Sequence, residues 1–231
     1  MYMDLLHGNC YELIKNLPDK SIDVCITDPP YLFKELGGGI MRKRDYTNQL
    51  ADLNCCNFNP SVFLDAIHSK LKKTYIYAFC NKSLVSEYIS WAQKHKCNYD
   101  ILVMCKSNPI PAYNNHYLSD LEYIIVIREP GTYFCKEKDI ELYRKWFMTS
   151  CKKGLHPAEK PVTLLEKFIK VSCPDNGTVL DPFMGSGSTG VACVRTKRNF
   201  IGIEIDDKYF KLAKERINET KSENILFDMA V

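Results

Sequence analysis

Short apolar runs alternate along this chain with longer helical patterns, and this alternation limits the folds that the chain can adopt. Six runs rich in β-branched and aromatic residues have the near-continuous apolar character of strands buried on both faces. They lie at 22–27, 74–79, 99–105, 122–128, 178–180 and 200–204. Helical patterns are expected at 82–95, 163–172, 188–196 and 207–220, and Asn9 and Asn59 are placed to cap two further helices. Strands that alternate with helices predict an α/β fold built on a mainly parallel sheet.

The length of the chain suits one such domain. There are 231 residues, 45% of them hydrophobic and 26% charged, with a net charge of +3, and a domain typically takes about 100–200 residues. We therefore predict a single domain over 1–231. The longest apolar runs, such as 124–127, are far shorter than the roughly 18 residues of a membrane helix. No secretory signal opens the sequence, so we expect a cytoplasmic protein without membrane contact.

The 11 cysteines could indicate disulfide bonds or a zinc site, but their pattern favours neither. Their number is odd, no export signal is visible, and a chain of this length can bury a core without cross-links. No two cysteines have the C-x-x-C spacing, and Cys55 and Cys56 are adjacent, which is poor geometry for a shared tetrahedral site. We expect mostly buried, reduced thiols and no metal.

A glycine-rich turn joins the predicted strand 178–180 to the predicted helix 188–196. Gly185, Gly187 and Gly190 have the G-x-G-x-x-G spacing, and Glu204 ends the next strand. In that context the glycines allow a ligand to approach the backbone, and the carboxylate can accept hydrogen bonds from ribose hydroxyls. A dinucleotide site would open the domain rather than close it, and Asp181 suits a cationic group better than a pyrophosphate. The turn therefore predicts a nucleoside ligand of another kind.

A second unusual turn follows the predicted strand 22–27. It reads Asp28-Pro29-Pro30-Tyr31. The prolines fix the backbone and leave carbonyls outside the strand ladder, and the tyrosine ring offers a flat face to a planar substrate. Ligands of open α/β sheets bind at the carboxyl ends of strands, so the two turns are expected to converge although they are far apart in sequence.

Together these motifs resemble those of the S-adenosylmethionine-dependent amino-methyltransferases of DNA. Residues 28–31 resemble the catalytic motif, and residues 181–187 resemble the cofactor motif. Residues 156–162 and 106–109 resemble two further motifs of the family. The catalytic motif comes first, which resembles the circularly permuted β-group. The resemblance implies a Rossmann-like methyltransferase fold, with a mainly parallel seven-stranded sheet and helices on both faces, and S-adenosylmethionine as the cofactor.

The resemblance also implies roles for individual residues. The Asp28 carboxylate and the Pro29 carbonyl would accept hydrogen bonds from the amine of a base that has left the duplex, and Tyr31 would stack on that base. Pro30 completes the catalytic motif. Glu204 would hold the ribose hydroxyls, and Lys160 would pair with the cofactor carboxylate. The implied cofactor-binding residues are Asp28, His156, Lys160, Pro161, Asp181, Phe183, Gly185, Ser186, Gly187, Ser188, Glu204 and Ile205.

The catalytic motif favours adenine N6 as the methylated atom. Members that methylate cytosine N4 more often carry serine at the position of Asp28. Cytosine N4 in DNA and adenine in RNA remain alternatives. An oxidoreductase would not account for residues 28–31, and a silent nucleic-acid-binding module would not need the acid at position 28.

Contact with double-stranded DNA is expected at two basic clusters, because phosphate contacts need lysine and arginine. These candidates are Arg42, Lys43, Arg44, Lys152 and Lys153, with Asn108 as a further polar candidate. The candidate recognition segments 32–57, 107–119 and 130–153 are shorter than the insert that family members usually carry. Either the recognised sequence is brief, or a second subunit or another protein supplies contacts, so a homodimer stays open. Pairing with a restriction enzyme, or an orphan or phage role, stays open as well.

Overall fold

The computed structural model describes residues 1–30, 58–109, 117–150 and 159–230, with side chains as far as 224. The predicted segment 32–57 lies outside the described residues, as do parts of 107–119 and 130–153. The elements are β1 (Met3–His7), α1 (Cys10–Leu13), the 3-10 helix η1 (Ile14–Asn16), β2 (Val24–Thr27), α3 (Pro60–His68), β3 (Tyr75–Cys80), α4 (Val85–Lys94), β4 (Asn98–Lys106), β5 (Leu121–Arg128), the 3-10 helix η4 (Ile140–Tyr143), β6 (Trp146–Thr149), α5 (Val162–Ser172), β7 (Thr178–Asp181), α6 (Ser188–Arg195), β8 (Asn199–Glu204) and α7 (Asp207–Ala230).

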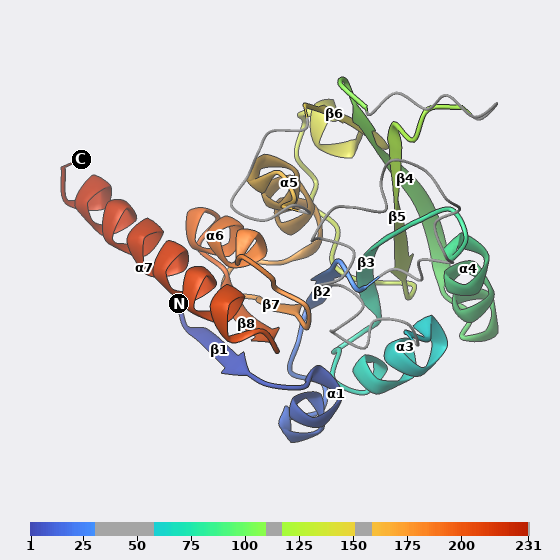
Figure 1. The fold of residues 1–231 in the computed structure, drawn as a ribbon, viewed down its shortest axis with the longest axis horizontal. Helices are drawn as coiled ribbons and strands as arrows, with labels where there is room; N and C mark the ends of the chain where they lie inside the picture. Colours follow the sequence, from blue (N-terminus) through green and yellow to red (C-terminus); the bar gives the residue numbers. More distant parts are fainter. Residues whose placement is uncertain (31–57, 110–116, 151–158, 231) are drawn as a thin grey trace, which may run out of the picture.

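The strands form one sheet in the order β1-β8-β7-β2-β3-β5-β4-β6 (Figure 1). β5 runs antiparallel to β3 and β4, and the other neighbouring pairs are parallel. The predicted mainly parallel α/β sheet is confirmed, but the expected seven strands are wrong because the sheet has 8. The apolar pattern missed both edge strands, β1 and β6. β6 has only four residues, and it is a strand because it pairs with the backbone of β4, which no local pattern reveals.

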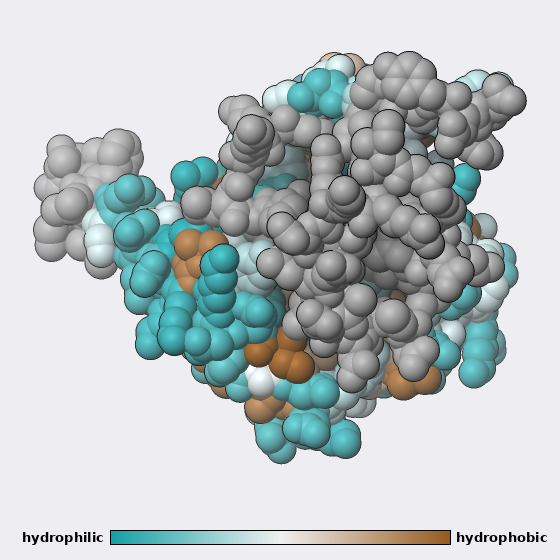
Figure 2. Space-filling view, viewed as in Figure 1, coloured by the Kyte–Doolittle hydropathy of each residue, from teal (hydrophilic) through white to brown (hydrophobic). Residues whose placement is uncertain are grey.

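The predicted helices form, and two of their boundaries differ by more than one residue. The Asn9 side chain accepts the N–H of Tyr11, and Asn59 accepts the N–H of Val62 at the start of α3, so both predicted caps are present. α4 begins at Val85 rather than at residue 82. α7 continues ten residues beyond the predicted end at 220, as far as Ala230. Its described surface is mainly hydrophilic (Figure 2).

Helices cover both faces of the sheet, as predicted. α1, α3 and α4 lie on one face, and α5, α6 and α7 lie on the other (Figure 1). Successive residues of a strand point to opposite faces, so Val24 and Ile26 of β2 enter the core under α5 and α6, whereas Cys25 enters the core under α3 and α4. Burial on both faces is the reason that the strands have continuous apolar runs rather than an alternating pattern.

The described cysteines agree with the expected buried thiols. Eight are free, and seven of these are buried. Burial raises the pKa of Cys10, Cys80 and Cys173 to about 12, so these thiols stay protonated and unreactive near neutral pH. Within the described ranges, no group of three or more histidine, cysteine, aspartate or glutamate side chains is placed to hold a metal ion. No helix there is long and apolar enough to cross a membrane.

Candidate active site

Three acidic side chains gather where neighbouring parallel strands end. Asp28 follows β2, Asp181 ends β7 and Glu204 ends β8. β7 lies between β2 and β8 in the sheet, so the three carboxylates share its carboxyl edge. This is the edge at which open α/β sheets bind ligands. The two sequence turns therefore converge, as predicted.

Asp28 is held by a nearly buried lysine. The Nζ atom of Lys160 lies 2.5 Å from Oδ2 of Asp28 and 3.3 Å from Oε2 of Glu122, and Lys160 is only 8% exposed. Nζ also lies 5.0 Å from the centre of the Phe79 ring. Burial lowers the pKa of Lys160, but the Asp28 and Glu122 carboxylates outweigh burial and raise it above its usual value. The predicted contact of Lys160 with the cofactor carboxylate remains a prediction, because the structure describes these protein carboxylates as its partners.

Asp181 is buried without a cationic partner in the described part of the chain. Its Oδ1 accepts the N–H of Phe183 at 3.2 Å, and its Oδ2 accepts the hydroxyl of Thr189 at 2.6 Å. Burial and the nearby Asp28 carboxylate together raise the pKa of Asp181 to about 7, against the lowering effect of these hydrogen bonds. A buried acid with such a pKa can accept the charge of a cationic ligand.

Two glycines of the turn serve different purposes. Gly185 and Gly187 have φ angles of +52° and +82°, a left-handed region that favours glycine. A Cβ atom on Gly187 would lie 2.9 Å from Cβ of Ala213 in α7, whereas a Cβ on Gly185 would meet nothing within 4 Å. Gly187 thus permits close packing, and Gly185 leaves open space above the turn. The hydroxyl of Ser188, at the start of α6, is buried without a hydrogen-bond partner among the described atoms.

Glu204 closes the other side of this turn. Its Oε2 accepts the N–H of Gly185, and its Oε1 accepts the N–H of Asp206, both at 2.8 Å. Burial raises its pKa. Each oxygen has a second lone pair, so the carboxylate can still accept hydroxyl groups of a ligand. Ile205, next in the chain, is 57% exposed, and its side chain is open to a ligand.

The other predicted residues of this site take varied positions. Phe183 packs its ring against Phe58 and Phe63, with centres 5.9 and 5.4 Å away, so part of its surface serves the core. Pro29 is buried and Pro30 half-buried. Pro161 is the N-cap residue of α5, and Ser186 is buried.

Some predicted site residues lie outside the described ranges, so their placement stays a prediction. These are Tyr31, Arg42, Lys43, Arg44, Lys152, Lys153 and His156. Asn108 is described, and it is an exposed residue just beyond the end of β4. It therefore lies at the same edge of the sheet as Asp28.

The sequence patterns missed several charged groups around this site. Arg216 of α7 donates to the carbonyl and hydroxyl oxygens of Ser186 at 2.7 and 2.9 Å, and it pairs with Glu159 at 2.6 Å. Glu122 pairs with Lys160 and also, at 2.6 Å, with Lys106. A signal existed for Glu122, an acid inside an apolar run. Arg216 is one of many charged residues of a helix, so its position in the sequence gave no comparable signal.

The start of the chain also contributes to the site. The N–H of Gly8, just after β1, donates to the carbonyl of Glu204 at 2.9 Å, and Nε2 of His7 lies 3.1 Å from the carbonyl of Ile205. β1 is an edge strand that the apolar pattern missed. Because β1 pairs in parallel with β8, its carboxyl end lies next to Glu204. Only this strand pairing, and no local sequence pattern, places it there.

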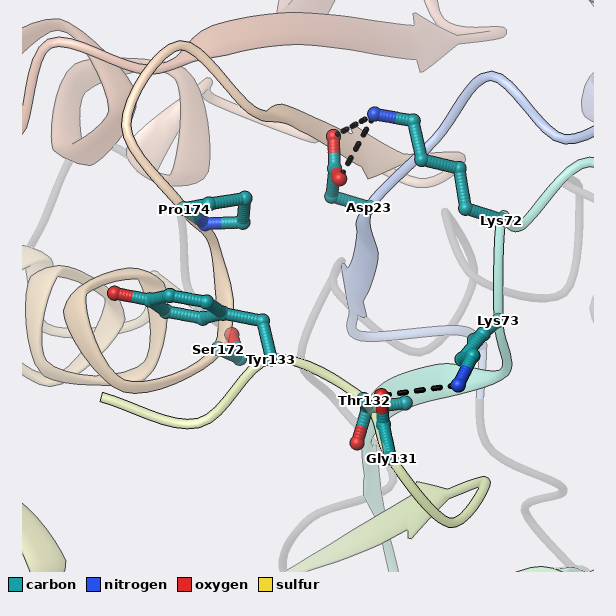
Figure 3. A pocket seen from close by; sticks show the side chains of 8 residues that line it. All are labelled: Asp23, Lys72, Lys73, Gly131, Thr132, Tyr133, Ser172 and Pro174. Carbon is teal, nitrogen blue, oxygen red and sulfur yellow. Dashed lines mark hydrogen bonds and ion pairs between the residues drawn. The ribbon is translucent and has the colours of Figure 1, made fainter. Parts of the chain in front are cut away.

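A cavity of about 290 Å³ lies at the opposite edge of the sheet, near the start of β2 (Figure 3). There both oxygens of Asp23 bind Nζ of Lys72 at 2.9 Å, and Lys73 donates to the carbonyl of Gly131 at 3.0 Å. The residues lining this cavity include none of those predicted for catalysis or cofactor binding. The candidate active site is therefore the cluster at the carboxyl edge.

Comparison with known families agrees with this geometry. A family model described as DNA methylase matches residues 22–215. The chain belongs to this family of N6/N4 DNA methylases. The matched range includes both turns, so the predicted DNA amino-methyltransferase family is confirmed, and with it S-adenosylmethionine as the cofactor.

Individual members of the N6/N4 DNA methylases match along most of this chain. The type II methyltransferase M2.LlaDCHI of Lactococcus lactis subsp. cremoris is 28% identical, over 93% of this chain and 89% of its own length. The crystal structure of the M1.HpyAVI–SAM complex is 28% identical, with a TM-score of 0.70 over 93% of this chain and 99% of that one. The cytosine-N4-specific PvuII DNA methyltransferase is 16% identical, with a TM-score of 0.68 over 96% of this chain and 92% of that one. At that identity the likeness to the PvuII enzyme shows a common fold and no more.

Proposed function

We propose that this DNA methylase transfers the methyl group of S-adenosylmethionine to the N6 amine of adenine in double-stranded DNA. The observation that carries the proposal is the Asp28-Pro29-Pro30 turn at the carboxyl edge of the sheet. There the Asp28 carboxylate is held by Lys160 at 2.5 Å and lies close enough to Asp181 to raise its pKa. An acid fixed beside the glycine-rich turn can accept a hydrogen bond from the target amine and hold that amine close to a methyl donor bound at the turn.

The chemistry asked of the protein is to make a poor nucleophile reactive. The lone pair of an exocyclic amine is delocalised into the base, and hydrogen bonds accepted from its two protons favour a geometry that frees the lone pair. We assign these acceptors to the carboxylate of Asp28 and the carbonyl of Pro29. The nitrogen then bonds to the methyl carbon as the carbon–sulfur bond breaks, and one amine proton passes to solvent. The contribution of the protein is positioning and electrostatic polarisation.

The residues of the glycine-rich turn fit a cationic nucleoside. When bound, S-adenosylmethionine supplies an activated methyl group on a positively charged sulfur. We assign the ribose hydroxyls to Glu204 and the cationic end to the neighbourhood of Asp181, whose buried carboxyl has a pKa of about 7. The open space above Gly185 and the buried hydroxyl of Ser188, without a partner among the described residues, support a ligand at this place.

Contact with DNA is proposed for the segments next to the carboxyl edge. The N–H of Ser107 donates to the carbonyl of Thr149 at 2.8 Å, so the described parts of 107–119 and 130–153 meet at the ends of β4 and β6. Asn108 lies there as well. The DNA contacts of the two basic clusters stay predictions, and so does the homodimer. Sedimentation with and without DNA tests whether the enzyme is a dimer.

The choice of adenine rests on aspartate at position 28 rather than serine. The same acceptors would suit the N4 amine of cytosine, and adenine in RNA would present the same amine. These alternatives predict different products, so the identity of the methylated nucleoside separates them.

The deciding experiment incubates the enzyme with tritium-labelled S-adenosylmethionine and duplex DNA or RNA, and identifies the labelled nucleoside. Label in N6-methyladenine of DNA is expected, whereas label in N4-methylcytosine, or in RNA alone, would overturn the proposal. Asp28→Ala serves as the inactive control. It should lose transfer while keeping most of its DNA binding, and turnover by this variant would refute the role of Asp28.

A further inference from the structure

Four charged side chains of alternating sign form a row beside the candidate active site. Lys106, Glu122, Lys160 and Asp28 follow one another, with successive N–O distances of 2.6, 3.3 and 2.5 Å. All four side chains are largely buried, with exposures of 25%, 20%, 8% and 21% in that order. The row ends on the carboxylate that the proposed function places against the target amine.

The sheet itself builds this row. Asp28 follows β2, Glu122 belongs to β5 and Lys106 ends β4. In the sheet β3 lies between β2 and β5, and the ring of its Phe79 makes a cation–π contact with the Lys160 ammonium. Four adjacent strands thus supply the environment of one ammonium group. Asp28, Glu122 and Lys106 are thus fixed at or near strand ends, and Lys160, which lies just before α5, is held between the Asp28 and Glu122 carboxylates.

We propose that Glu122 is a positioning residue for methyl transfer, which holds the Lys160 ammonium in place and thereby orients the Asp28 carboxylate toward the target amine. Lys106 orients Glu122 from the other side. The inference rests on the proposed function for the identity of the reaction. It adds a role for Glu122 and Lys106, two charged residues to which the proposed function assigns none.

The physical reason lies in the geometry of a buried ammonium. An ammonium has three N–H donors and no fixed orientation of its own. With Asp28 as its single carboxylate partner, Lys160 would be free to move around that carboxylate and to cover both of its oxygens. The attraction of Glu122 draws Nζ to one side, where it binds Oδ2 of Asp28. This contact fixes the position of Oδ2, and with it the orientation of the whole Asp28 carboxylate.

The balance of charge in the row also supports a role for Glu122. The row contains two ammonium groups and two carboxylates, so its net charge is zero. A buried ion pair is strongly destabilised when one partner is removed, because the other is left uncompensated. Lys106 and Lys160 lower the pKa of Glu122 although burial raises it, so Glu122 stays ionised near neutral pH.

The test compares the wild-type enzyme with Glu122→Gln, which keeps the shape and removes the charge. We expect kcat to fall by about 10–100-fold, in the range that misplacement of a catalytic group produces. The dissociation constants for S-adenosylmethionine and DNA should change by less than about twofold. Glu166→Gln is the matched control, because Glu166 has a similar exposure of 21% and pairs with Arg195 at 3.4 Å, but lies away from the row. It should leave kcat unchanged.

The pH dependence distinguishes positioning from general damage to the fold. Loss of Glu122 removes one carboxylate that raises the pKa of Lys160. The Glu122→Gln enzyme should therefore lose activity on the basic side at a lower pH than the wild-type enzyme does. Lys106→Gln removes a like charge instead, so it should shift the pKa of Lys160 upward. Shifts of the same sign in both variants would overturn the inference.

A second readout does not depend on catalysis. The ¹³Cε resonance of Lys160, followed against pH by NMR, should titrate at lower pH in Glu122→Gln than in the wild type, with Glu122→Asp restoring much of the difference. If wild-type enzyme methylates no DNA, the proposed function fails while this titration still tests the row. If methylation proceeds but neither kcat nor the titration responds to Glu122→Gln, the inference about Glu122 is overturned and the proposed function stands.

Discussion

Asp28 and Asp181 stand at the ends of two neighbouring parallel strands, yet their surroundings differ in two respects. Lys160 lies 2.5 Å from Asp28, whereas the described partners of Asp181 are the hydroxyl of Thr189 and the N–H of Phe183. Asp181 is also the more deeply buried, at 4% exposure. A cation therefore compensates one carboxylate, whereas the described residues stabilise the other with neutral dipoles.

This difference shows how one edge of a sheet supports two kinds of acid. Neutral donors do not offset the burial of Asp181, so its pKa rises to about 7. A cationic ligand would supply the missing charge, which suits Asp181 to bind S-adenosylmethionine. Asp28 already has its counter-ion in the protein, which suits it to accept hydrogen bonds from a neutral amine.

The largest effect is expected from removing the cation of the Asp28 pair. Lys160→Met leaves Asp28 and Glu122 close together without their shared ammonium. Breaking a buried pair in this way costs about 3–5 kcal/mol, so the free energy of unfolding in urea should fall by that amount. Lys72→Met is the control, because Lys72 is 52% exposed in its pair with Asp23, and about 1 kcal/mol or less is expected there. Equal losses would show that Lys160 is no more important than a surface lysine.

The next effect separates the two acids by function. Asp28→Asn should lower the single-turnover rate of methyl transfer by about 100–1,000-fold, the usual loss when a group that stabilises the transition state is removed. Its affinity for S-adenosylmethionine should change much less. Asp181→Asn should do the opposite and weaken cofactor binding more than it slows transfer in saturating cofactor. The same pattern in both variants, measured by rapid quench and calorimetry, would contradict the division of roles.

A smaller effect follows from the raised pKa of Asp181. The folded protein binds more protons than the unfolded chain between about pH 4 and pH 7, so Asp181 destabilises the fold as the pH rises through that window. A raise from 3.8 to about 7 sets an upper limit near 4 kcal/mol. Asp181→Asn should exceed the wild type in stability by about 2 kcal/mol at pH 8, after the loss of a charged hydrogen bond. The advantage should disappear near pH 4, and urea unfolding across the pH range measures it.

The smallest effect is a proton released on cofactor binding. A cation bound beside Asp181 lowers the pKa of that carboxyl, so about half a proton should leave at pH 7. Calorimetry in buffers of different ionisation enthalpy measures this release. Asp181→Asn should abolish the release and Asp28→Asn should not. A release that persists in Asp181→Asn would assign the proton to another group.

Much of the fold was predictable because central strands that are buried on both faces have a continuous run of apolar residues. The central strands β2, β3, β7 and β8 are continuous apolar runs, and the cap residues Asn9 and Asn59 mark the starts of α1 and α3. The edge strands β1 and β6 lack such a run, because their side chains stay partly or fully exposed. The expected seven strands therefore became 8.

The types of residue and their spacing already specify the two turns and the chemistry that each can perform. Acids, glycines and prolines at fixed spacings limit the backbone and the ligands locally, and Asp28, Asp181 and Glu204 could be singled out for that reason. The partners of these acids depend instead on how the chain packs. Lys160 comes to Asp28 across 132 positions, and Glu122 and Lys106 join them from two further strands. Charge compensation depends on distances of a few ångströms between residues remote in sequence, and only the packed sheet sets those distances.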